Sequence, residues 1–390
     1  MFDLTQTVDR RGTGNMKGAF PVRGETSLIP LILAGAEMDF PTAPVIREAL
    51  SAFALRGIYG FTLPDGDYLA SVLWWLRSQR HMRVEEEDVV PTLGTIFALN
   101  TAIRAFTEPG DGVILMTPSY SRHDRSVLRN GRNILSCPLV WSEGRYAMDP
   151  EALSGLMAEK RNRLLVLCHP HNPTGRVWGQ EELRSLAGLA DKWGVRVFSD
   201  EIFADITHPL HPAAAMTDLL PDLAMSCTSL GKTFNFTGVN HAHVVIRDRD
   251  MREKYLQQRN TDHFGSLDPF FYQAVRAGYT PQGAEWVRAV RDQVMANHAM
   301  LQEEVRDRGY ILAPWEGGFV GWMRAESMTG EELALRLERK ESVLVDSGRE
   351  YGEAGEGWIR FNLAAPSATI RAFARRLGAP EMGAGRHAED

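Results

Sequence analysis

The sequence predicts an α/β fold in which a mainly parallel sheet, flanked by helices, is followed by a smaller α+β domain. Two observations point to this class. Before Gln282, short apolar runs alternate with segments of about 10–15 residues that have helical spacing. After Gln282 the pattern changes to a long charged helix and then to short strands. The chain has 390 residues, which suits about two domains of ordinary size.

The first part of the chain contains the strands and helices expected for the parallel sheet. The apolar runs expected to be strands are residues 88–93, 113–116, 164–168 and 195–199. Residues 97–106 and 181–193 carry apolar side chains at helical spacing, and Gly194 ends the second of these helices. Strands that are joined by helices pair in parallel and are covered on both faces.

The second part of the chain is expected to form the smaller domain. It should hold a helix over residues 285–308, strands near 319–323 and Trp358–Asn362, and a helix over 368–377. The whole pattern predicts four segments. They are an N-terminal arm with part of the small domain (1–45), a large domain that holds the parallel sheet (46–282), a small C-terminal domain (283–377) and a flexible tail (378–390).

Composition excludes several classes of function. Lys and Arg number 43 and Asp and Glu number 50, so the net charge of −7 argues against a nucleic-acid-binding face. The three cysteines, Cys137, Cys168 and Cys227, fit no zinc pattern and no disulfide framework. The first residues are polar, unlike a signal peptide, and the longest apolar stretch is too short for a membrane span. We expect a cytoplasmic protein with no metal, no nucleic-acid partner and no membrane contact.

Polar residues follow three of the predicted strands, where ligands bind in sheets of this kind. Asp200 directly follows one strand, and Asn172 lies in a His-Pro-His-Asn-Pro-Thr-Gly loop after another. Gly94, Thr95 and Ile96 follow a third strand and begin a helix, whose backbone amides can bind phosphate. Each feature also has an ordinary explanation: a helix N-cap, a loop without function, or a simple turn.

Two basic residues are candidates for chemistry. Lys232, in Ser-Leu-Gly-Lys-Thr-Phe-Asn, would become a nucleophile if burial lowered its pKa, although most lysines are solvated surface charges. Arg360 lies on the apolar strand Trp358–Asn362 and needs an anion there. That anion is either a carboxylate of the protein or the carboxylate of a substrate.

In this order, the phosphate turn, the Asn-Pro-Thr-Gly loop, Asp200, the Ser-x-x-Lys segment and the late arginine resemble the fold-type I pyridoxal-phosphate (PLP) enzymes. The resemblance is to the class I/II aminotransferase superfamily and extends from Asp9 to Leu377. It implies an aspartate aminotransferase-like large domain with a seven-stranded sheet, PLP as the cofactor, and a homodimer with shared active sites.

The resemblance also implies a role for each matching residue. Lys232 would carry PLP covalently, Asp200 would hold the pyridine nitrogen, and Tyr120 would stack on the ring, which makes these three the catalytic set. The other implied cofactor residues are Asn172 at the phenolic oxygen, Phe203 beside the ring, Gly94, Thr95, Ile96 and Ser229 at the phosphate, and Tyr59 reaching the partner's phosphate. The implied substrate residues are Arg360 for the α-carboxylate, Ala36, Tyr59 and His123.

Three N-terminal segments narrow the resemblance to the MalY/PatB subgroup of cystathionine β-lyase-like C–S lyases. They are Asp-Arg-Arg-Gly-Thr-Gly-Asn-Met-Lys (9–17), Ala-Glu-Met-Asp-Phe (36–40) and Gly-Ile-Tyr-Gly (57–60). The usual forms of the first two are close to Asp-Arg-x-Gly-Thr-x-Ser-x-Lys and Ala-Asp-Met-Asp-Phe.

Two departures bear on the reaction. Phe203 stands where aminotransferases usually have a tyrosine that donates to the phenolic oxygen of the cofactor. Asn240, with His241 and His243 nearby, stands where they usually have an arginine that binds phosphate. Lyases of the subgroup also tend to lack this arginine, whereas Phe203 is unusual for both groups.

The resemblance therefore implies a PLP-dependent C–S β-lyase that cleaves a cysteine S-conjugate to a thiol, pyruvate and ammonia. Arg122, His123 and Arg125 make the pocket region polar and favour a polar or bulky S-substituent. Three alternatives remain open: an aminotransferase, a decarboxylating or oxidatively deaminating enzyme on a similar substrate, and a PLP-bound regulatory protein.

Overall fold

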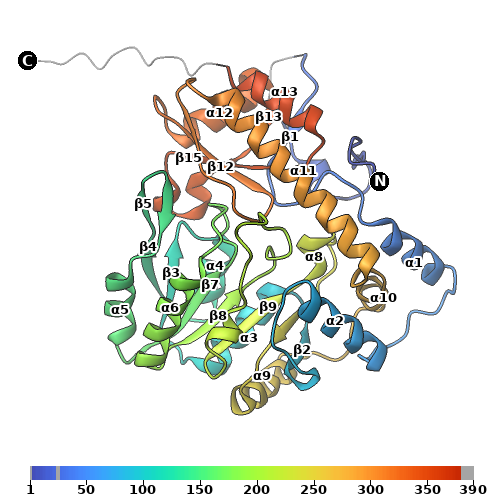
Figure 1. Ribbon diagram of the computed structural model, residues 1–390, viewed down its shortest axis with the longest axis vertical. Coiled ribbons are helices and arrows are strands. Elements are labelled where there is room, and N and C mark those ends of the chain that lie inside the picture. The colour runs from blue at the N-terminus through green and yellow to red at the C-terminus, as the bar shows by residue number, and fades with distance from the viewer. Residues whose placement is uncertain (1, 23–26, 379–390) are drawn as a thin grey trace, which may run out of the picture.

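A seven-stranded sheet forms the centre of the protein in the computed structural model, which describes residues 2–22 and 27–378 (Figure 1). Its strands, in spatial order, are β2 (Val89–Thr92), β10 (Ala242–Val245), β9 (Ala224–Thr228), β8 (Arg196–Asp200), β7 (Asn162–Cys168), β3 (Gly112–Thr117) and β4 (Asn133–Pro138). Strand β10 is antiparallel to both of its neighbours, and the other pairs are parallel. The predicted α/β class is confirmed.

The central strands are apolar on both faces because helices cover both. Val113, Leu115 and Val166 pack in one apolar cluster with helices α3 (Thr95–Phe106) and α9 (Arg249–Thr261). Ile114 and Leu165 point to the opposite face, where they pack against α5 (Pro150–Ala158) and α6 (Gln180–Trp193). This burial on both faces explains why the strands read as continuous apolar runs rather than as alternating ones.

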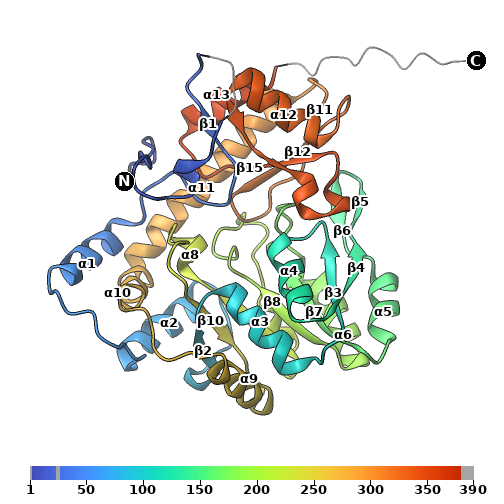
Figure 2. The ribbon, with the colours of Figure 1, turned by 180° about the vertical axis from the view of Figure 1, so that it is seen from behind.

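A four-stranded antiparallel sheet forms the core of the C-terminal part. Its order is β11 (Tyr310–Leu312), β12 (Val320–Ala325), β15 (Trp358–Asn362) and β14 (Asp346–Ser347). Helices α12 (Gly330–Glu341) and α13 (Ser367–Leu377) pack beside this sheet (Figure 2). Strand β1 (Leu31–Ile32) pairs in parallel with β13 (Val343–Leu344), so the N-terminal segment lies on this part of the molecule.

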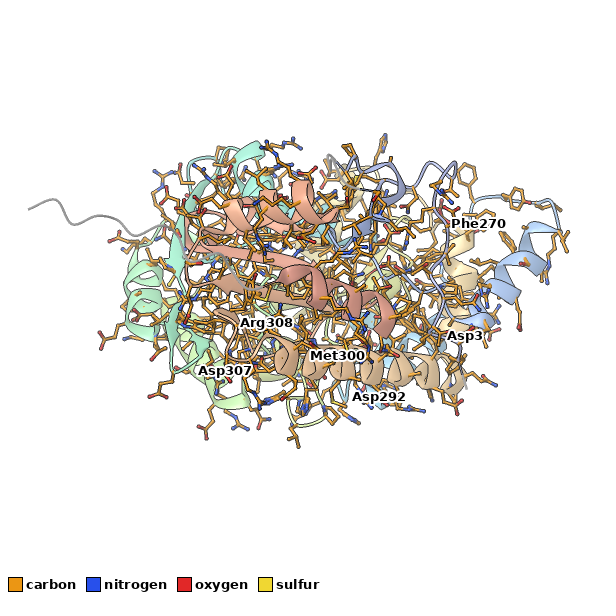
Figure 3. The ribbon with its side chains drawn as sticks, turned by 90° about the horizontal axis from the view of Figure 1, so that it is seen from above. Asp3, Phe270, Asp292, Met300, Asp307 and Arg308 are labelled. Atoms are coloured by element: carbon orange, nitrogen blue, oxygen red, sulfur yellow. The ribbon has the colours of Figure 1, made fainter. Side chains whose placement is uncertain are left out.

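The long helix α11 (Pro281–Val305) runs along one face of the molecule, packs against α13 and β11, and ends near Asp307 and Arg308 (Figure 3). It begins as the sequence requires, because Pro281 occupies the first turn and the Thr280 side chain accepts a hydrogen bond from Gly283 N at 3.2 Å. Its buried stripe includes Val290, Val294 and Leu301.

Other elements complete the two layers. They are α1 (Pro44–Ala54), α2 (Gly66–Ser78), α4 (Ser121–Arg129), α7 (Met216–Leu219), α8 (Leu230–Thr233), α10 (Pro269–Gly278) and the hairpin of β5 (Val140–Ser142) and β6 (Arg145–Ala147). No helix within the described residues is long and apolar enough to cross a membrane. The four domain limits stay predictions, and the predicted tail lies outside the described residues except for Gly378.

Candidate active site

The sheet brings three of the predicted polar residues to one edge. In the strand register, Asp200 at the end of β8 lies between Cys168 of β7 and Cys227 of β9. Asn172 follows the end of β7, and Ser229 follows the end of β9. Carboxyl ends of neighbouring parallel strands meet at the same edge of a sheet, which is where open α/β sheets bind ligands.

Asp200 is buried, and a histidine holds it. Its Oδ2 atom lies 3.1 Å from His123 Nε2, and its Oδ1 atom accepts a hydrogen bond from Ile202 N at 3.3 Å. His123 is itself buried, in the first turn of α4. The structure therefore places His123 against Asp200, and its expected contact with the substrate stays a prediction. The side chain is drawn inward because it is the hydrogen-bond partner of a buried carboxylate.

Lys232 lies in the short helix α8, which Ser229 caps by accepting a hydrogen bond from Gly231 N at 3.0 Å. The Lys232 amine donates to the carbonyl oxygen of Ala36 at 2.5 Å. Burial, together with the nearby positive charge of Arg360, lowers the pKa of this amine to about 8. About a tenth of the amine is therefore neutral, and so nucleophilic, at pH 7, far more than for a lysine of ordinary pKa.

Tyr120 and Asn172 line a small pocket at the same edge, together with His123, Cys168 and His171. Asn172 Oδ1 accepts a hydrogen bond from Arg360 Nη1 at 3.1 Å, which joins the Asn-Pro-Thr-Gly loop to strand β15. The Tyr120 ring packs edge-on against His123, and burial raises the pKa of the Tyr120 hydroxyl. The predicted ring-binding residues are thus brought together.

Arg360 is buried and already has a carboxylate partner, Asp346. Its Nε donates to Asp346 Oδ2 at 2.9 Å, and its Nη2 donates to the same oxygen. The first of the two explanations left open by the sequence, a carboxylate of the protein, is therefore present. A guanidinium has five N–H groups, so one N–H on each Nη stays available for a substrate carboxylate.

Gly94 begins α3 in a conformation that favours glycine, with φ of +82°. A Cβ atom there would lie 3.6 Å from His241 N, so the loop runs close against the β10 backbone. The adjacent amides of Thr95 and Ile96 are in the first turn of a twelve-residue helix, where an anion is stabilised. Ser229 Oγ, which donates to His241 O at 2.8 Å, borders the same place.

The two histidines beside Asn240 do not replace the missing arginine. His241 Nε2 and His243 Nε2 lie 2.6 and 2.7 Å from the buried hydroxyl of Tyr68. Burial lowers the pKa of His243 to about 3 and that of His241 well below its usual range, so both rings are neutral at pH 7. They form a structural cluster, and sequence reasoning missed its third member, Tyr68, because it lies in α2, far from the motif.

Two further predicted residues have clear positions. Phe203 is buried against Phe319, with ring centroids 5.1 Å apart, and Lys232 Nζ lies 5.8 Å from the Phe203 ring centroid. Tyr59 is half-exposed, stacks on Phe270 and donates to Ala54 O, so it does not enter the site of its own chain. Its expected contact with a partner's phosphate stays a prediction.

The donor set fits PLP. A partly buried lysine, a buried acid fixed by a histidine, a tyrosine beside the pocket and a helix N-terminus that begins at a glycine fit its aldehyde, ring nitrogen, ring face and phosphate. Among the described residues, no three His, Cys, Asp or Glu side chains lie close enough together to hold a metal ion.

Comparison with known proteins agrees with this chemistry. Residues 32–377 match the family Aminotransferase class I and II. Cystathionine beta-lyase PatB of Bacillus subtilis is 33% identical over 384 residues, with 96% of each chain covered, and protein MalY of Escherichia coli is 28% identical, with 95% of this chain and 96% of MalY covered. The solved structure of cystalysin from Treponema denticola, which contains PLP, is 28% identical, with a TM-score of 0.89 and 97% and 98% of the two chains covered. The chain therefore belongs to the class I and II aminotransferase family and is a PLP-dependent enzyme.

Proposed function

We propose that this enzyme is a C–S β-lyase that cleaves a cysteine S-conjugate. The observation that carries this choice is the similarity to the PatB lyase along almost the whole chain. It is supported by the site geometry, in which the charges of Arg360 and Asp200 both act on the Lys232 amine. The reaction balances as one S-substituted cysteine plus one water giving a thiol, pyruvate and ammonia.

Each side chain has a defined task in this proposal. Bound PLP supplies an electron sink for the carbanion that forms at the substrate's Cα. Arg360 binds the α-carboxylate with its two remaining N–H groups and so orients the Cα–H bond. The neutral Lys232 amine takes the Cα proton as a general base. Asp200, held by His123, keeps a proton on the ring nitrogen.

The experiment follows the fate of the substrate. The purified enzyme with PLP is incubated with S-alkyl and S-aryl cysteines, and thiol, pyruvate, ammonia and CO₂ are measured. We expect thiol and pyruvate in equal amounts without an added 2-oxo acid. A product that requires a 2-oxo acid would show an aminotransferase instead. An aldehyde formed with CO₂ would show a decarboxylating enzyme, and no turnover would favour a regulatory role.

Two finer proposals concern the substrate and the assembly. Arg122 and Arg125 are exposed in the first two turns of α4, directly after Tyr120, and support a polar S-substituent. The segment between α1 and α2 exposes large apolar side chains, which supports a homodimer that buries them. These side chains are Leu55, Ile58, Tyr59, Phe61 and Leu63. A cytoplasmic location stays a prediction, in keeping with three free, buried thiols.

A further inference from the structure

The backbone of residues 35–40, a short strip, contacts the two groups that would bind the substrate: Lys232 directly and Arg360 through Asp346. The carbonyl of Ala36 accepts the hydrogen bond of the Lys232 amine at 2.5 Å. One residue earlier, Gly35 N donates to Asp346 Oδ2 at 3.0 Å, and Asp346 is the carboxylate that holds Arg360. Ala36 therefore contacts the Lys232 amine, and Gly35 contacts the Arg360 guanidinium through Asp346. In the proposed function, these two groups lie on either side of the substrate's Cα.

Residues close to Lys232 and Arg360 in the sequence also form hydrogen bonds with residues 35–40. Asn235, three residues after Lys232, donates to Met38 O at 3.0 Å and to Phe40 O at 2.8 Å, and accepts from Met38 N at 2.9 Å. Asn362, two residues after Arg360, donates to Glu37 O at 2.9 Å. A displacement of the strip would therefore disturb the lysine loop and strand β15 together.

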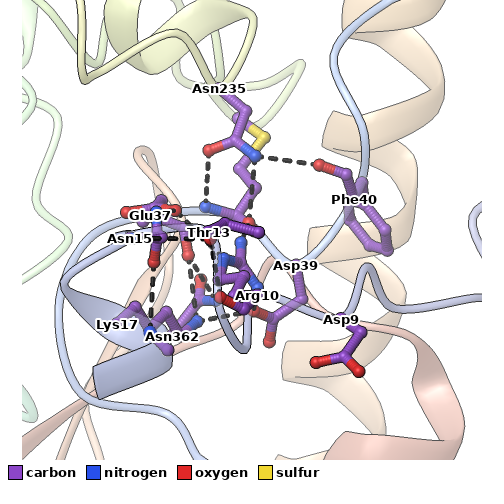
Figure 4. A network of polar contacts seen from close by, with 12 residues as sticks. Asp9, Arg10, Thr13, Asn15, Lys17, Glu37, Asp39, Phe40, Asn235 and Asn362 are labelled. Atoms are coloured by element: carbon purple, nitrogen blue, oxygen red, sulfur yellow. Dashed lines mark hydrogen bonds and ion pairs between the residues drawn. The ribbon is translucent and has the colours of Figure 1, made fainter. Parts of the chain in front are cut away.

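The N-terminal arm holds the strip from its other side (Figure 4). Arg10 donates to Asp39 Oδ1 at 3.0 Å, to Glu37 Oε1 at 3.1 Å and to Met38 O. Lys17 donates to Asp39 Oδ1 at 2.6 Å and to Glu37 O at 3.1 Å. Asn15 Nδ2 adds a hydrogen bond to Glu37 Oε1 at 2.8 Å.

Burying the charged groups of this network costs free energy, so a contribution to stability alone does not account for it. Lys17 is 4% exposed, and its burial lowers the pKa of its amine even though Asp39 favours the charged form. Buried ion pairs can often be replaced by apolar residues without loss of stability, because desolvation offsets their attraction. What the pairs do provide is a fixed geometry for the carbonyl groups of residues 36–38.

We propose that residues 35–40 are a positioning strip that fixes the Lys232 amine relative to the Arg360 guanidinium, and that Arg10, Asn15 and Lys17 are positioning residues that hold it. This inference rests on the roles proposed above for Lys232 and Arg360. The arm then acts on the reaction without touching the substrate.

The test compares neighbouring arginines of the arm. Arg10→Met removes the hydrogen bonds of Arg10 to residues 37–39. Arg11→Met is the matched control, because Arg11 pairs only with Asp9 among the described residues and its side chain is 85% exposed. PLP attachment to the cofactor-free protein is followed across pH by borohydride reduction and mass analysis of the Lys232 peptide. We expect a loosened strip to admit water, to return the Lys232 pKa toward its usual range and to slow attachment at pH 7 at least fivefold. Attachment should recover at high pH.

A second measurement isolates the guanidinium. The holoenzyme is titrated calorimetrically with 3-(methylthio)propanoate, which has the carboxylate but no amino group and therefore cannot react with PLP. Arg10→Met should weaken its binding at least fivefold, Arg10→Lys should restore part of the affinity, and Arg11→Met should change nothing. Asn15→Ala removes two partly buried hydrogen bonds, one to Glu37 Oε1 and one from Gly18 N. It leaves both ion pairs in place, so it should show the same effects more weakly and guards against a variant that fails to fold.

The outcomes separate this inference from the proposed function. Folded Arg10→Met and Asn15→Ala proteins that keep the wild-type pH profile and wild-type affinity for the analogue would overturn the positioning role alone. Wild-type protein that never attaches PLP at Lys232 would overturn the proposed function, and this inference with it. A lower melting temperature together with a wild-type pH profile would mean that the arm is merely structural, and would also overturn the inference.

Discussion

The environment of Lys232 decides when its amine can react. Burial lowers the pKa of this amine from its usual 10.5 to about 8, so the native state prefers the neutral form. At pH 7 the amine is mostly protonated, and the neutral fraction grows as pH rises through 8. The same difference makes the unfolded state bind more protons between about pH 8 and pH 10.5, so this residue's contribution to stability rises with pH in that window.

We predict from this that the rate of PLP attachment to the cofactor-free protein rises steeply between about pH 7 and pH 8 and levels off above about pH 9. Stopped-flow absorbance at the start of mixing measures it. Lys254→Ala, at an exposed lysine in α9, is the control and should not change the profile. A midpoint near pH 10.5 would show that Lys232 is solvated, in conflict with the structure.

The family resemblance implies that Phe203 lies beside the phenolic oxygen of the cofactor, where it would lack the donor that a tyrosine gives. We predict that Phe203→Tyr moves the pH at which the absorbance of bound PLP changes to a lower value. The added hydroxyl would compete for that oxygen with the proton on the lysine nitrogen, and a hydrogen bond of this kind is worth about 1 kcal/mol. A spectrophotometric pH titration measures the shift, and Phe319→Tyr, one ring farther out, is the comparison. An unchanged midpoint would place residue 203 away from the phenolic oxygen.

Among the elements, the N-terminus of α3 is the proposed binding site for the phosphate of PLP, and position 240 is Asn240 rather than the arginine that aminotransferases usually have there. We predict that Gly94→Ala weakens PLP binding about fivefold. The reason is strain, because φ of +82° costs an alanine roughly 1 kcal/mol, while its Cβ would meet only ordinary contacts. Fluorescence titration gives the dissociation constant, and Gly188→Ala, in open space on α6, is the control. Equal dissociation constants for the wild-type and Gly94→Ala proteins would mean that the loop accommodates alanine without strain.

The periodic elements were predictable because their pattern is local. The predicted strands at 113–116 and 164–168 became β3 (Gly112–Thr117) and β7 (Asn162–Cys168), and the helix at 181–193 became α6 (Gln180–Trp193). Strand β9 was missed, because its sequence of Ala, Met, Ser, Cys and Thr gives no apolar run.

The contacts that complete the site were not predictable from local patterns. Asp346 holds Arg360 and is bound by Gly35, which is 311 residues away in sequence. Tyr68 joins two histidines more than 170 residues away. Neither residue lies in a motif, and only the packing of the two sheets and the arm brings them to the site. The position of His123 in the sequence likewise indicated the region of the site, but it did not predict that the ring would point toward Asp200.

At the scale of the whole molecule, the exposed apolar segment between α1 and α2 argues for a second copy. Tyr59 stacks on Phe270 at the end of α10, on the side of the molecule from which α1 projects (Figure 3). Phe61 is 99% exposed and Leu55 is 89% exposed. Patches of this kind on a stable protein usually become buried in an interface.

We predict that the wild-type protein is a dimer and that Phe61→Asp weakens it, because a carboxylate buried at an apolar interface is costly. Light scattering after size-exclusion chromatography measures the mass. Leu210→Asp, at another site with 80% exposure, is the control and should stay dimeric. A monomeric wild-type protein that is fully active would contradict both the dimer and the shared site.

The most direct test is to identify the residue to which PLP binds covalently. The protein is incubated with PLP, reduced with borohydride, digested and mapped by mass spectrometry. We predict one pyridoxyl group per chain, on Lys232 and on no other lysine, and none on a Lys232→Ala protein that remains folded. A label distributed over surface lysines, or no label at all, would contradict the central claim that the buried Lys232 amine binds the cofactor.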